Sequence, residues 1–257
     1  MQDLPPFLAE QVQMLLCDAD GNLFPSEEPA FDASVQVTNA FLAEIGSDRR
    51  FTAGELRLAA TGMNFRTTAL RLAAEAGVPD ADVEPWVAEE KRAVSAHLAA
   101  TLRPHPETRT ALTELAAHLT LAAVSSSALS RLAGCFTATD LDELIPPARR
   151  FSAEDSLATP TSKPHPAVYL HACAELGIAP AAGLAVEDSV PGVLSAVAAG
   201  CPTVGNVLFV PSAEREQRAA DLRDAGALAV VGSWRELADL LLPALTRRVV
   251  STTGAAR

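Results

Sequence analysis

The stretch LLCDADGN, residues 15–22, places two aspartates and a glycine directly after an apolar run. Apolarity that is continuous rather than alternating predicts a strand buried on both faces, as in a parallel sheet covered by helices. Such runs recur along the chain, with turns and helical patterns between them, at residues 12–17, 119–124, 183–187, 201–206 and 227–232. The alternation predicts an α/β fold with a doubly wound parallel sheet.

The alternation stops between about Ser26 and Leu102, where the sequence has no convincing strand pattern. Residues 41–46, 68–77 and 86–102 have the periodicity of amphipathic helices instead. A segment of this length is too long for a crossover connection and too ordered for a loop. We therefore expect two domains, an α/β core of residues 1–25 and 103–257 and an inserted all-helical domain of residues 26–102.

Composition and charge exclude several classes of partner. A formal net charge of −12 argues against binding to nucleic acid or to anionic membranes. No apolar stretch approaches the ~20 residues of a membrane span, and residues 1–13 lack the basic start and apolar core of a signal peptide. The four cysteines are scattered singly, as expected for reduced thiols. We expect a cytoplasmic protein that is a monomer or a small homo-oligomer.

Polar and charged side chains follow the ends of three predicted strands, where a doubly wound sheet binds its ligands, and one lysine precedes the helix that leads into the third strand. The set comprises Asp18, Asp20, Ser125, Ser126, Ser127, Lys163, Glu187 and Asp188. Several carboxylates packed together stay ionised only if a cation neutralises them. Oxygen ligands without a His or Cys cluster suit a hard ion, so we expect a Mg²⁺ site. A metal flanked by a lysine and serine hydroxyls is what a phosphoryl group requires.

The spacing of Asp18 and Asp20 gives each carboxylate a separate role. Residues two apart in an extended segment point the same way, so both can face one substrate. An aspartate can attack phosphorus and form an aspartyl-phosphate that water then hydrolyses. We expect Asp18 to attack, and Asp20 to donate a proton to the leaving oxygen and later to take one from water. Gly21 lets the chain turn sharply beside them.

These residues resemble the motifs of a known family. DADGN with a following S-E, SSS after a strand, SKPHP and VEDSVPGV stand in the order and spacing of the four motifs of the haloacid dehalogenase superfamily. The closest resemblance is to the subgroup that holds sugar-phosphate phosphatases and β-phosphoglucomutase, in which a small helical cap follows the first motif. The resemblance implies a Rossmann-like core and makes residues 26–102 the cap.

The resemblance also implies a role for each motif residue. It makes Asp18 the nucleophile and Asp20 the general acid/base, the same roles that their spacing suggests. The implied Mg²⁺ ligands are Asp18, the backbone carbonyl of Asp20 and Asp188, with Glu187 beside the ion. The implied phosphate-binding residues are Ser125, Ser126 and Lys163. The cap of the family closes over the site and sets specificity, and the candidates for this role are Asn64 and Arg66.

Three positions depart from the family pattern. The usual DGT or DGV is DGN here, which places Asn22 after the glycine. Pro25 stands where the family has an aspartate. The mutase branch uses a histidine early in its cap, and the corresponding segment SEEPAFD, residues 26–32, has none. The missing histidine favours simple hydrolysis.

We therefore expect a Mg²⁺-dependent phosphatase that acts on a small phosphorylated metabolite, with sugar phosphates among the candidates, through an aspartyl-phosphate. Two alternatives stay open. A phosphomutase of the β-phosphoglucomutase type would produce an isomer of its substrate instead of inorganic phosphate. A non-catalytic binding module on the same fold would release no phosphate, and Asn22 is the sequence feature that favours it.

Overall fold

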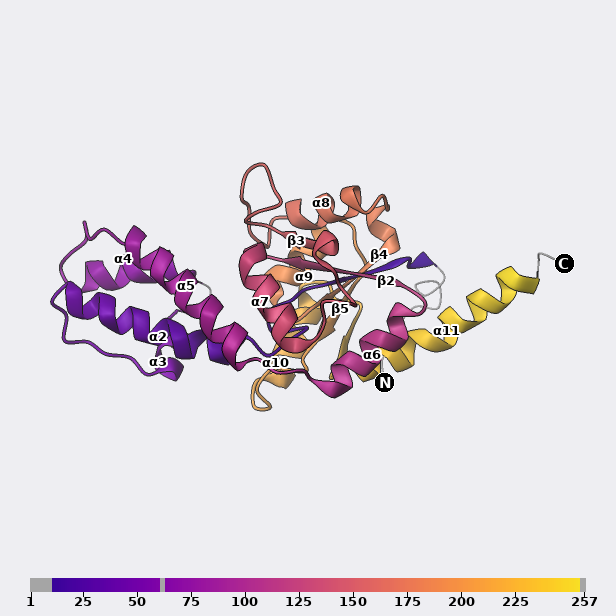
Figure 1. Cartoon of the computed structure of the whole chain (residues 1–257), viewed down its shortest axis with the longest axis horizontal. Coiled ribbons are helices and arrows are strands. Elements are labelled where there is room, and N and C mark those ends of the chain that lie inside the picture. The colour runs from indigo at the N-terminus through magenta and orange to yellow at the C-terminus, as the bar shows by residue number, and fades with distance from the viewer. Residues whose placement is uncertain (1–10, 61–62, 255–257) are drawn as a thin grey trace. The chain divides into compact units, whose positions relative to one another are not determined.

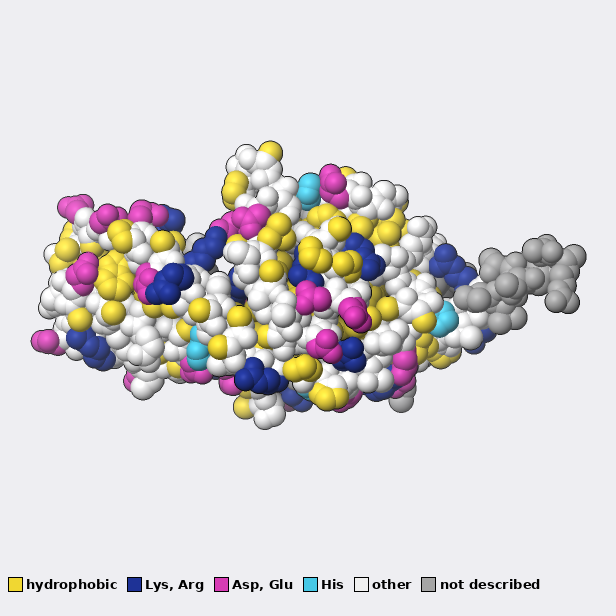
Figure 2. All heavy atoms as spheres, in the orientation of Figure 1, with side chains coloured by type: hydrophobic (Ala, Val, Ile, Leu, Met, Phe, Trp, Pro, Cys, Tyr) yellow, Lys and Arg dark blue, Asp and Glu magenta, His cyan; other side chains and the backbone are white. Residues whose placement is uncertain are grey.

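The structure is a computed structural model that describes residues 11–60 and 63–254 (Figure 1). These residues form two compact units, a helical unit from Pro25 to Leu102 and a core unit from the segments on either side of it. On the face shown in Figure 2, acidic, basic and hydrophobic side chains are interspersed. Among the described residues, no helix combines the length and the apolarity that a membrane crossing needs. Residues 1–10, on which part of the expected cytoplasmic location rests, lie outside the described residues.

One parallel sheet lies at the centre of the core unit. Its six strands in the described part of the chain are β1 (Met14–Cys17), β2 (Thr120–Ser125), β3 (Arg150–Ser152), β4 (Gly183–Glu187), β5 (Thr203–Asn206) and β6 (Ala229–Val231). Their order is β3-β2-β1-β4-β5-β6, and every pairing is parallel. β1 is central, with Cys17 in register with Ala123 of β2 and Val186 of β4. The predicted α/β fold with a doubly wound parallel sheet is confirmed.

One strand, β3, was not predicted from the sequence. It has three residues and begins with Arg150, so it contains no apolar run. The Arg150 side chain is nevertheless buried, because its guanidinium donates to the Ile145 carbonyl and to the Asp142 carboxylate. Its Cζ also lies 4.0 Å from the ring centroid of Phe136. Contacts with other parts of the fold bury this strand, and the local sequence pattern does not reveal such contacts.

Helices cover both faces of the sheet, as Figure 1 shows with α8 on one side and α6 and α11 on the other. They are α6 (Pro106–Ala116), α7 (Leu129–Thr139), α8 (Ala167–Glu175), α9 (Val190–Ala198), α10 (Arg215–Asp224) and α11 (Trp234–Gly254), with 3₁₀ turns at Pro147–Arg149 and Pro180–Ala182. Val168 and Tyr169 of α8 and Ala196 of α9 share one buried cluster with Leu16 and Ala185 of the sheet. The turns that follow the strands are therefore anchored in a packed core.

The helical unit contains α2 (Glu27–Glu44), α3 (Ala53–Ala59), α4 (Phe65–Glu75) and α5 (Glu84–Thr101). These helices share a hydrophobic core of their own that includes Phe41, Leu56 and Leu72. α3 lies outside the predicted helical segments. It begins at a capping box in which the side chains of Thr52 and Glu55 each accept a hydrogen bond from the other residue's backbone N–H.

Candidate active site

Three carboxylates meet at the centre of the sheet edge. Asp18 follows β1 directly, and its backbone N–H donates to the Val186 carbonyl of β4 at 2.9 Å, which extends the β1–β4 ladder by one residue. Glu187 ends β4, and Asp188 follows it. Only 7%, 0% and 7% of the surfaces of Asp18, Glu187 and Asp188 are exposed. The backbone of two neighbouring strands therefore holds these carboxylates together inside the protein.

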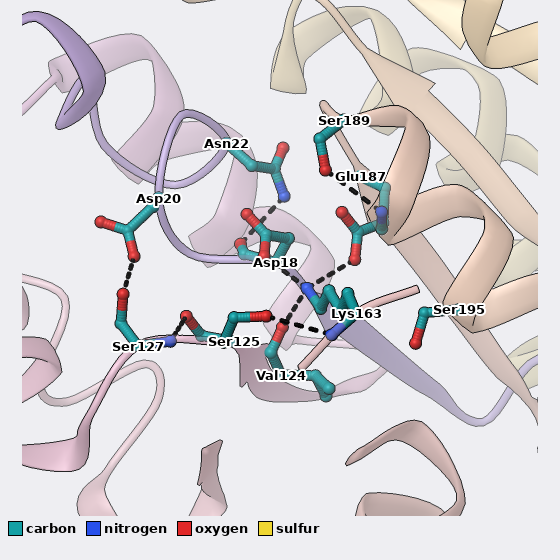
Figure 3. Close-up of polar contacts among 12 residues, drawn as sticks. Asp18, Asp20, Asn22, Val124, Ser125, Ser127, Lys163, Glu187, Ser189 and Ser195 are labelled. Atoms are coloured by element: carbon teal, nitrogen blue, oxygen red, sulfur yellow. Dashed lines mark hydrogen bonds and ion pairs between the residues drawn. The ribbon is translucent and has the colours of Figure 1, made fainter. Parts of the chain in front are cut away.

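The ammonium group of Lys163 enters this cluster from the loop before α8. Its Nζ donates to Oδ1 of Asp18 at 2.5 Å, to Oε1 of Glu187 at 2.7 Å and to the Val124 carbonyl at 2.8 Å (Figure 3). An ammonium group has three N–H donors, so all of them are used. Since only 6% of its side chain is exposed, Lys163 is a buried cation shared by two buried carboxylates.

Burial and neighbouring charges shift the titration of this pair. Burial raises the pKa of the Asp18 carboxyl well above its ordinary value, and the Lys163 ammonium opposes that rise. The carboxylates of Glu187 and Asp188 add to the rise. Burial would lower the pKa of Lys163, but Asp18 and Glu187 outweigh it and raise that pKa. Three carboxylates and one ammonium carry a net negative charge, which favours a further cation beside Asp18.

A buried tyrosine also contacts Glu187. The Tyr169 hydroxyl donates to Oε1 of Glu187, and Nζ of Lys163 lies 5.3 Å from the centroid of the Tyr169 ring. Burial, followed by the Glu187 charge, raises the pKa of Tyr169 well above its ordinary value, so the hydroxyl keeps the proton that it donates. Sequence reasoning missed this residue, because a single aromatic in an apolar helix predicts core packing.

Asp20 has partners of its own. Its Oδ2 accepts a hydrogen bond from Oγ of Ser127 at 2.7 Å, and Nη2 of Arg131 lies 3.3 Å from its Oδ1. Figure 3 shows the Asp20 side chain pointing toward Ser127. Ser127 belongs to the predicted set of strand-end residues, whereas Arg131 was not predicted. Both contacts orient the carboxylate that is the expected general acid/base.

The serine loop and the lysine loop lie together. The Ser127 N–H donates to Oγ of Ser125 at 3.0 Å, and Ser125 is almost fully buried. The backbone N–H of Lys163 donates to Oγ of Ser126 at 3.4 Å. The Ser126 hydroxyl therefore contacts the Lys163 backbone, and Figure 3 shows Ser125 near Lys163 and Asp18.

Asn22, the departure from DGT or DGV, is fully buried. Its Nδ2 donates to the Asp18 carbonyl at 3.0 Å and to the Val186 carbonyl at 2.9 Å, so the amide ties the turn to β4. Gly21 before it has a φ of 78°, in the left-handed region that favours glycine. A Cβ at Gly21 would overlap Oδ2 of Asp188. The predicted sharp turn at Gly21 is confirmed, and it also makes room for a carboxylate.

The two candidates for substrate specificity have partners within the helical unit. Asn64 is the N-cap of α4, where its Oδ1 accepts a hydrogen bond from the Thr67 N–H at 2.9 Å. Arg66 forms an ion pair with Glu84. These contacts account for both side chains locally, and their part in specificity stays a prediction.

The carboxylate cluster fits a hard cation. Asp18, Glu187 and Asp188 each offer one oxygen, and these oxygens lie within 4.8 Å of one another. Within the described residues, Oε2 of Glu187 is buried and accepts no hydrogen bond. A buried carboxylate oxygen without a partner is costly, and an ion that prefers oxygen ligands, such as Mg²⁺, would satisfy it. The residues present are therefore compatible with a magnesium site.

Sequence comparison identifies the family. Residues 12–200 match the family of haloacid dehalogenase-like hydrolases, and the match includes all four motifs and the inserted helices. The protein belongs to this family. β5, β6, α10 and α11 lie beyond the matched residues.

Solved structures and a curated relative agree with this assignment. A conserved haloacid dehalogenase-like protein of unknown function from Agrobacterium tumefaciens has a TM-score of 0.70 and 27% identity, over 90% of this chain and 98% of its own. A HAD family hydrolase from Deinococcus radiodurans, with bound phosphate and sodium, has a TM-score of 0.65 and 26% identity over the same shares. Hexitol phosphatase B of Escherichia coli K12 is 41% identical over 68 residues. That match spans 25% of this chain and 30% of the relative's length.

Proposed function

We propose that the protein is a Mg²⁺-dependent phosphatase that hydrolyses a small phosphorylated metabolite. The observation that carries the proposal is the position of the Lys163 ammonium between the carboxylates of Asp18 and Glu187. A buried cation at this place orients Asp18 and presents positive charge to a phosphoryl group. Membership of the haloacid dehalogenase-like hydrolases supports a hydrolytic reaction.

Asp18 is the proposed nucleophile. One of its carboxylate oxygens attacks phosphorus, and the bond between phosphorus and the leaving oxygen breaks with its electron pair going to that oxygen. The product of this step is an aspartyl-phosphate at Asp18. Lys163 holds the attacking carboxylate in one orientation through the 2.5 Å contact. Ser125 and Ser126 are the proposed hydroxyl donors to the phosphoryl oxygens.

Asp20 moves the protons. It donates a proton to the leaving oxygen in the first step, and it then takes a proton from the water that attacks phosphorus in the second step. That attack breaks the bond between phosphorus and the Asp18 oxygen and restores the free carboxylate. The hydroxyl of Ser127 and the guanidinium of Arg131 hold Asp20 in place. Proton transfer of this kind contributes about 10²–10⁴-fold to the rate.

The magnesium site would consist of Asp18, Asp188 and the Asp20 backbone carbonyl, with Glu187 beside it. When bound, Mg²⁺ supplies positive charge that stabilises the phosphoryl oxygens in the transition state. The buried Oε2 of Glu187 and the crowding of carboxylates around Asp18 support this assignment.

A phosphorylated sugar or sugar alcohol is the proposed substrate class. The support is the stretch of 41% identity with a protein named hexitol phosphatase B. Asn64 and Arg66 are the proposed specificity residues of the helical unit. A cytoplasmic location and the absence of nucleic-acid and membrane partners follow from the charge and composition of the chain, and they are part of the same proposal.

Release of inorganic phosphate from p-nitrophenyl phosphate, followed by a screen of sugar phosphates, tests the proposal. The wild-type protein should release phosphate with Mg²⁺ and stop when EDTA removes the ion. Asp18→Asn should abolish release, whereas the matched control Asp239→Asn, an exposed aspartate on α11, should leave it unchanged. Equal release by wild type and Asp18→Asn would contradict the proposal. An isomer of the sugar phosphate in place of inorganic phosphate would instead show a phosphomutase.

A further inference from the structure

Two buried asparagines connect the end of β5 to the proposed nucleophile. Nδ2 of Asn206 donates to Oδ1 of Asn22 at 2.8 Å, and Nδ2 of Asn22 donates to the Asp18 carbonyl at 3.0 Å. The connection begins at the Leu208 N–H, which donates to Oδ1 of Asn206 at 3.1 Å. Asn22 is 0% exposed and Asn206 is 1% exposed. Hydrogen bonds therefore run without a break from the loop after β5 to the backbone of Asp18.

The backbone groups at the two ends of this hydrogen-bonded chain determine which atom of each amide donates and which accepts. Nδ2 of Asn22 faces two backbone carbonyls, and Oδ1 of Asn206 faces a backbone N–H. Reversing either amide would bring two acceptors or two donors together, because each amide has separate donor and acceptor atoms. The indole N–H of Trp234 donates to the Asn22 carbonyl at 2.9 Å, which also holds the backbone of that residue. The side-chain amides of Asn22 and Asn206 therefore each have only one orientation that satisfies these hydrogen bonds.

The two carbonyls that Asn22 binds belong to neighbouring strand ends. One is the carbonyl of Asp18 and the other is that of Val186, which directly precedes Glu187. The Asn22 amide therefore spans the gap between the two segments from which the site's carboxylates project. Figure 3 shows Asn22 above Asp18 with its nitrogen toward the backbone. A shift of this amide would change the distance between the Asp18 carboxylate and the groups on β4.

We propose that Asn22 and Asn206 are positioning residues for Asp18, a role that rests on the proposed phosphatase function. Asn206 lies beyond residues 12–200, which match the family, so the match assigns it no role. A threonine at position 22 would have one hydroxyl donor and a valine none, whereas the Asn22 amide satisfies two carbonyls and accepts from Asn206. Misplacing a nucleophile by about 1 Å can cost ~10²-fold in rate, so this support bears directly on the chemistry.

The substitution Asn206→Leu tests the role without touching the carboxylates or Lys163. Leucine has a similar size, and it removes the donor to Asn22 and the acceptor for the Leu208 N–H. We expect kcat for p-nitrophenyl phosphate to fall by about tenfold or more, with KM changed by less than about twofold, well below the unfolding temperature. A purely structural role would lower the unfolding temperature and leave kcat of the folded protein unchanged.

Hydrogen exchange supplies a readout that does not depend on activity. The Gly21 N–H donates to the Phe24 carbonyl at 3.0 Å, and the Leu23 N–H donates to the Ala19 carbonyl at 2.9 Å, so the turn has protected amides. Asn206→Leu should speed exchange in the peptide of residues 18–24, although the changed residue lies far away in the sequence. Mass spectrometry of the deuterated peptides measures this.

Asn39→Leu is the matched control. Asn39 lies in the helical unit, where its amide bonds both the N–H and the carbonyl of Phe51 at 2.9 Å. Its replacement should lower stability and leave exchange in residues 18–24 unchanged.

Unchanged exchange in residues 18–24 of Asn206→Leu would overturn the proposal, and so would a wild-type kcat in that variant. Failure of the proposed function is visible separately, because the wild-type protein would then release no phosphate. The exchange measurement would still decide whether the two asparagines hold the turn.

Discussion

Nζ of Lys163 lies 2.5 Å from Oδ1 of Asp18, although 145 positions separate the two residues in the chain. Lys163 belongs to the loop before α8, and Asp18 follows the central strand β1. The contact forms only when the parallel sheet has been assembled. The site therefore depends on the order of the strands in the sheet, and no single segment of the chain contains it. Both partners are buried, and each depends on the other to keep its charge.

Replacing Lys163 by methionine should leave two buried carboxylates without their cation. We expect the free energy of unfolding to fall by about 3–5 kcal/mol and phosphate release to fall by ~10²-fold or more. Denaturant unfolding and steady-state kinetics measure the two effects. The other lysine of the chain, Lys91, is exposed on α5, so Lys91→Met should change stability by less than about 0.5 kcal/mol. Equal stability of the two variants would argue against a buried ion pair.

Tyr169 is the only tyrosine, so the absorbance of tyrosinate reports on this residue alone. Its pKa is raised in the folded protein, so the folded state keeps the proton to higher pH than the unfolded state does. The protonated Tyr169 therefore contributes its full stabilisation below about pH 10, the ordinary pKa of tyrosine in the unfolded state. This stabilisation is lost as the pH rises above that value. We expect ionisation to coincide with unfolding in a titration followed by absorbance and circular dichroism. Ionisation near pH 10 in a protein that stays folded would contradict the buried hydrogen bond to Glu187.

Gly192, in the first turn of α9, lies against Glu187. A Cβ at this position would overlap the Glu187 carboxylate, so Gly192→Ala should displace the group that binds Lys163. We expect a loss of about 1–3 kcal/mol of stability. Gly54 in α3 has nothing within 4 Å of an added Cβ, so Gly54→Ala should stabilise by about 0.4–1 kcal/mol. Thermal melts of the two variants should therefore shift in opposite directions. If Gly192→Ala were as stable as the wild type, Glu187 would have room to move away from the added Cβ.

The acidic part of the site could be predicted from the sequence, since its residues stand at the ends of apolar runs. Asp18 and Glu187 mark the ends of β1 and β4, and parallel strands end at the same edge of a sheet. Lys163 follows no strand, and it was predicted from its place before the helix that leads into β4, with which the order of the four motifs agrees.

Other parts of the site depend on contacts that no local pattern reports. Tyr169 and Arg131 lie on helices. In a helix, an aromatic residue predicts a side chain packed in the core, and an arginine predicts a side chain exposed to solvent. Their polar atoms reach Glu187 and Asp20 only because α7 and α8 pack beside those strand ends. Asn206 is the last residue of β5 as Glu187 is of β4, and this polar strand end was a signal that could have identified it.

The proposed phosphatase mechanism depends on phosphorylation of Asp18 during turnover. The measurement that tests it most directly is mass spectrometry of peptides after acid quenching with p-nitrophenyl phosphate and Mg²⁺, in the variant Asp20→Asn. Nitrophenolate leaves without a proton, so the phosphoenzyme should still form, whereas its hydrolysis should be slow because the general base is absent. We expect the mass of one phosphoryl group on the peptide that contains Asp18, and no such mass in Asp18→Asn. Phosphate on another residue, or phosphate release by the wild type with no phosphopeptide in the variant, would contradict it.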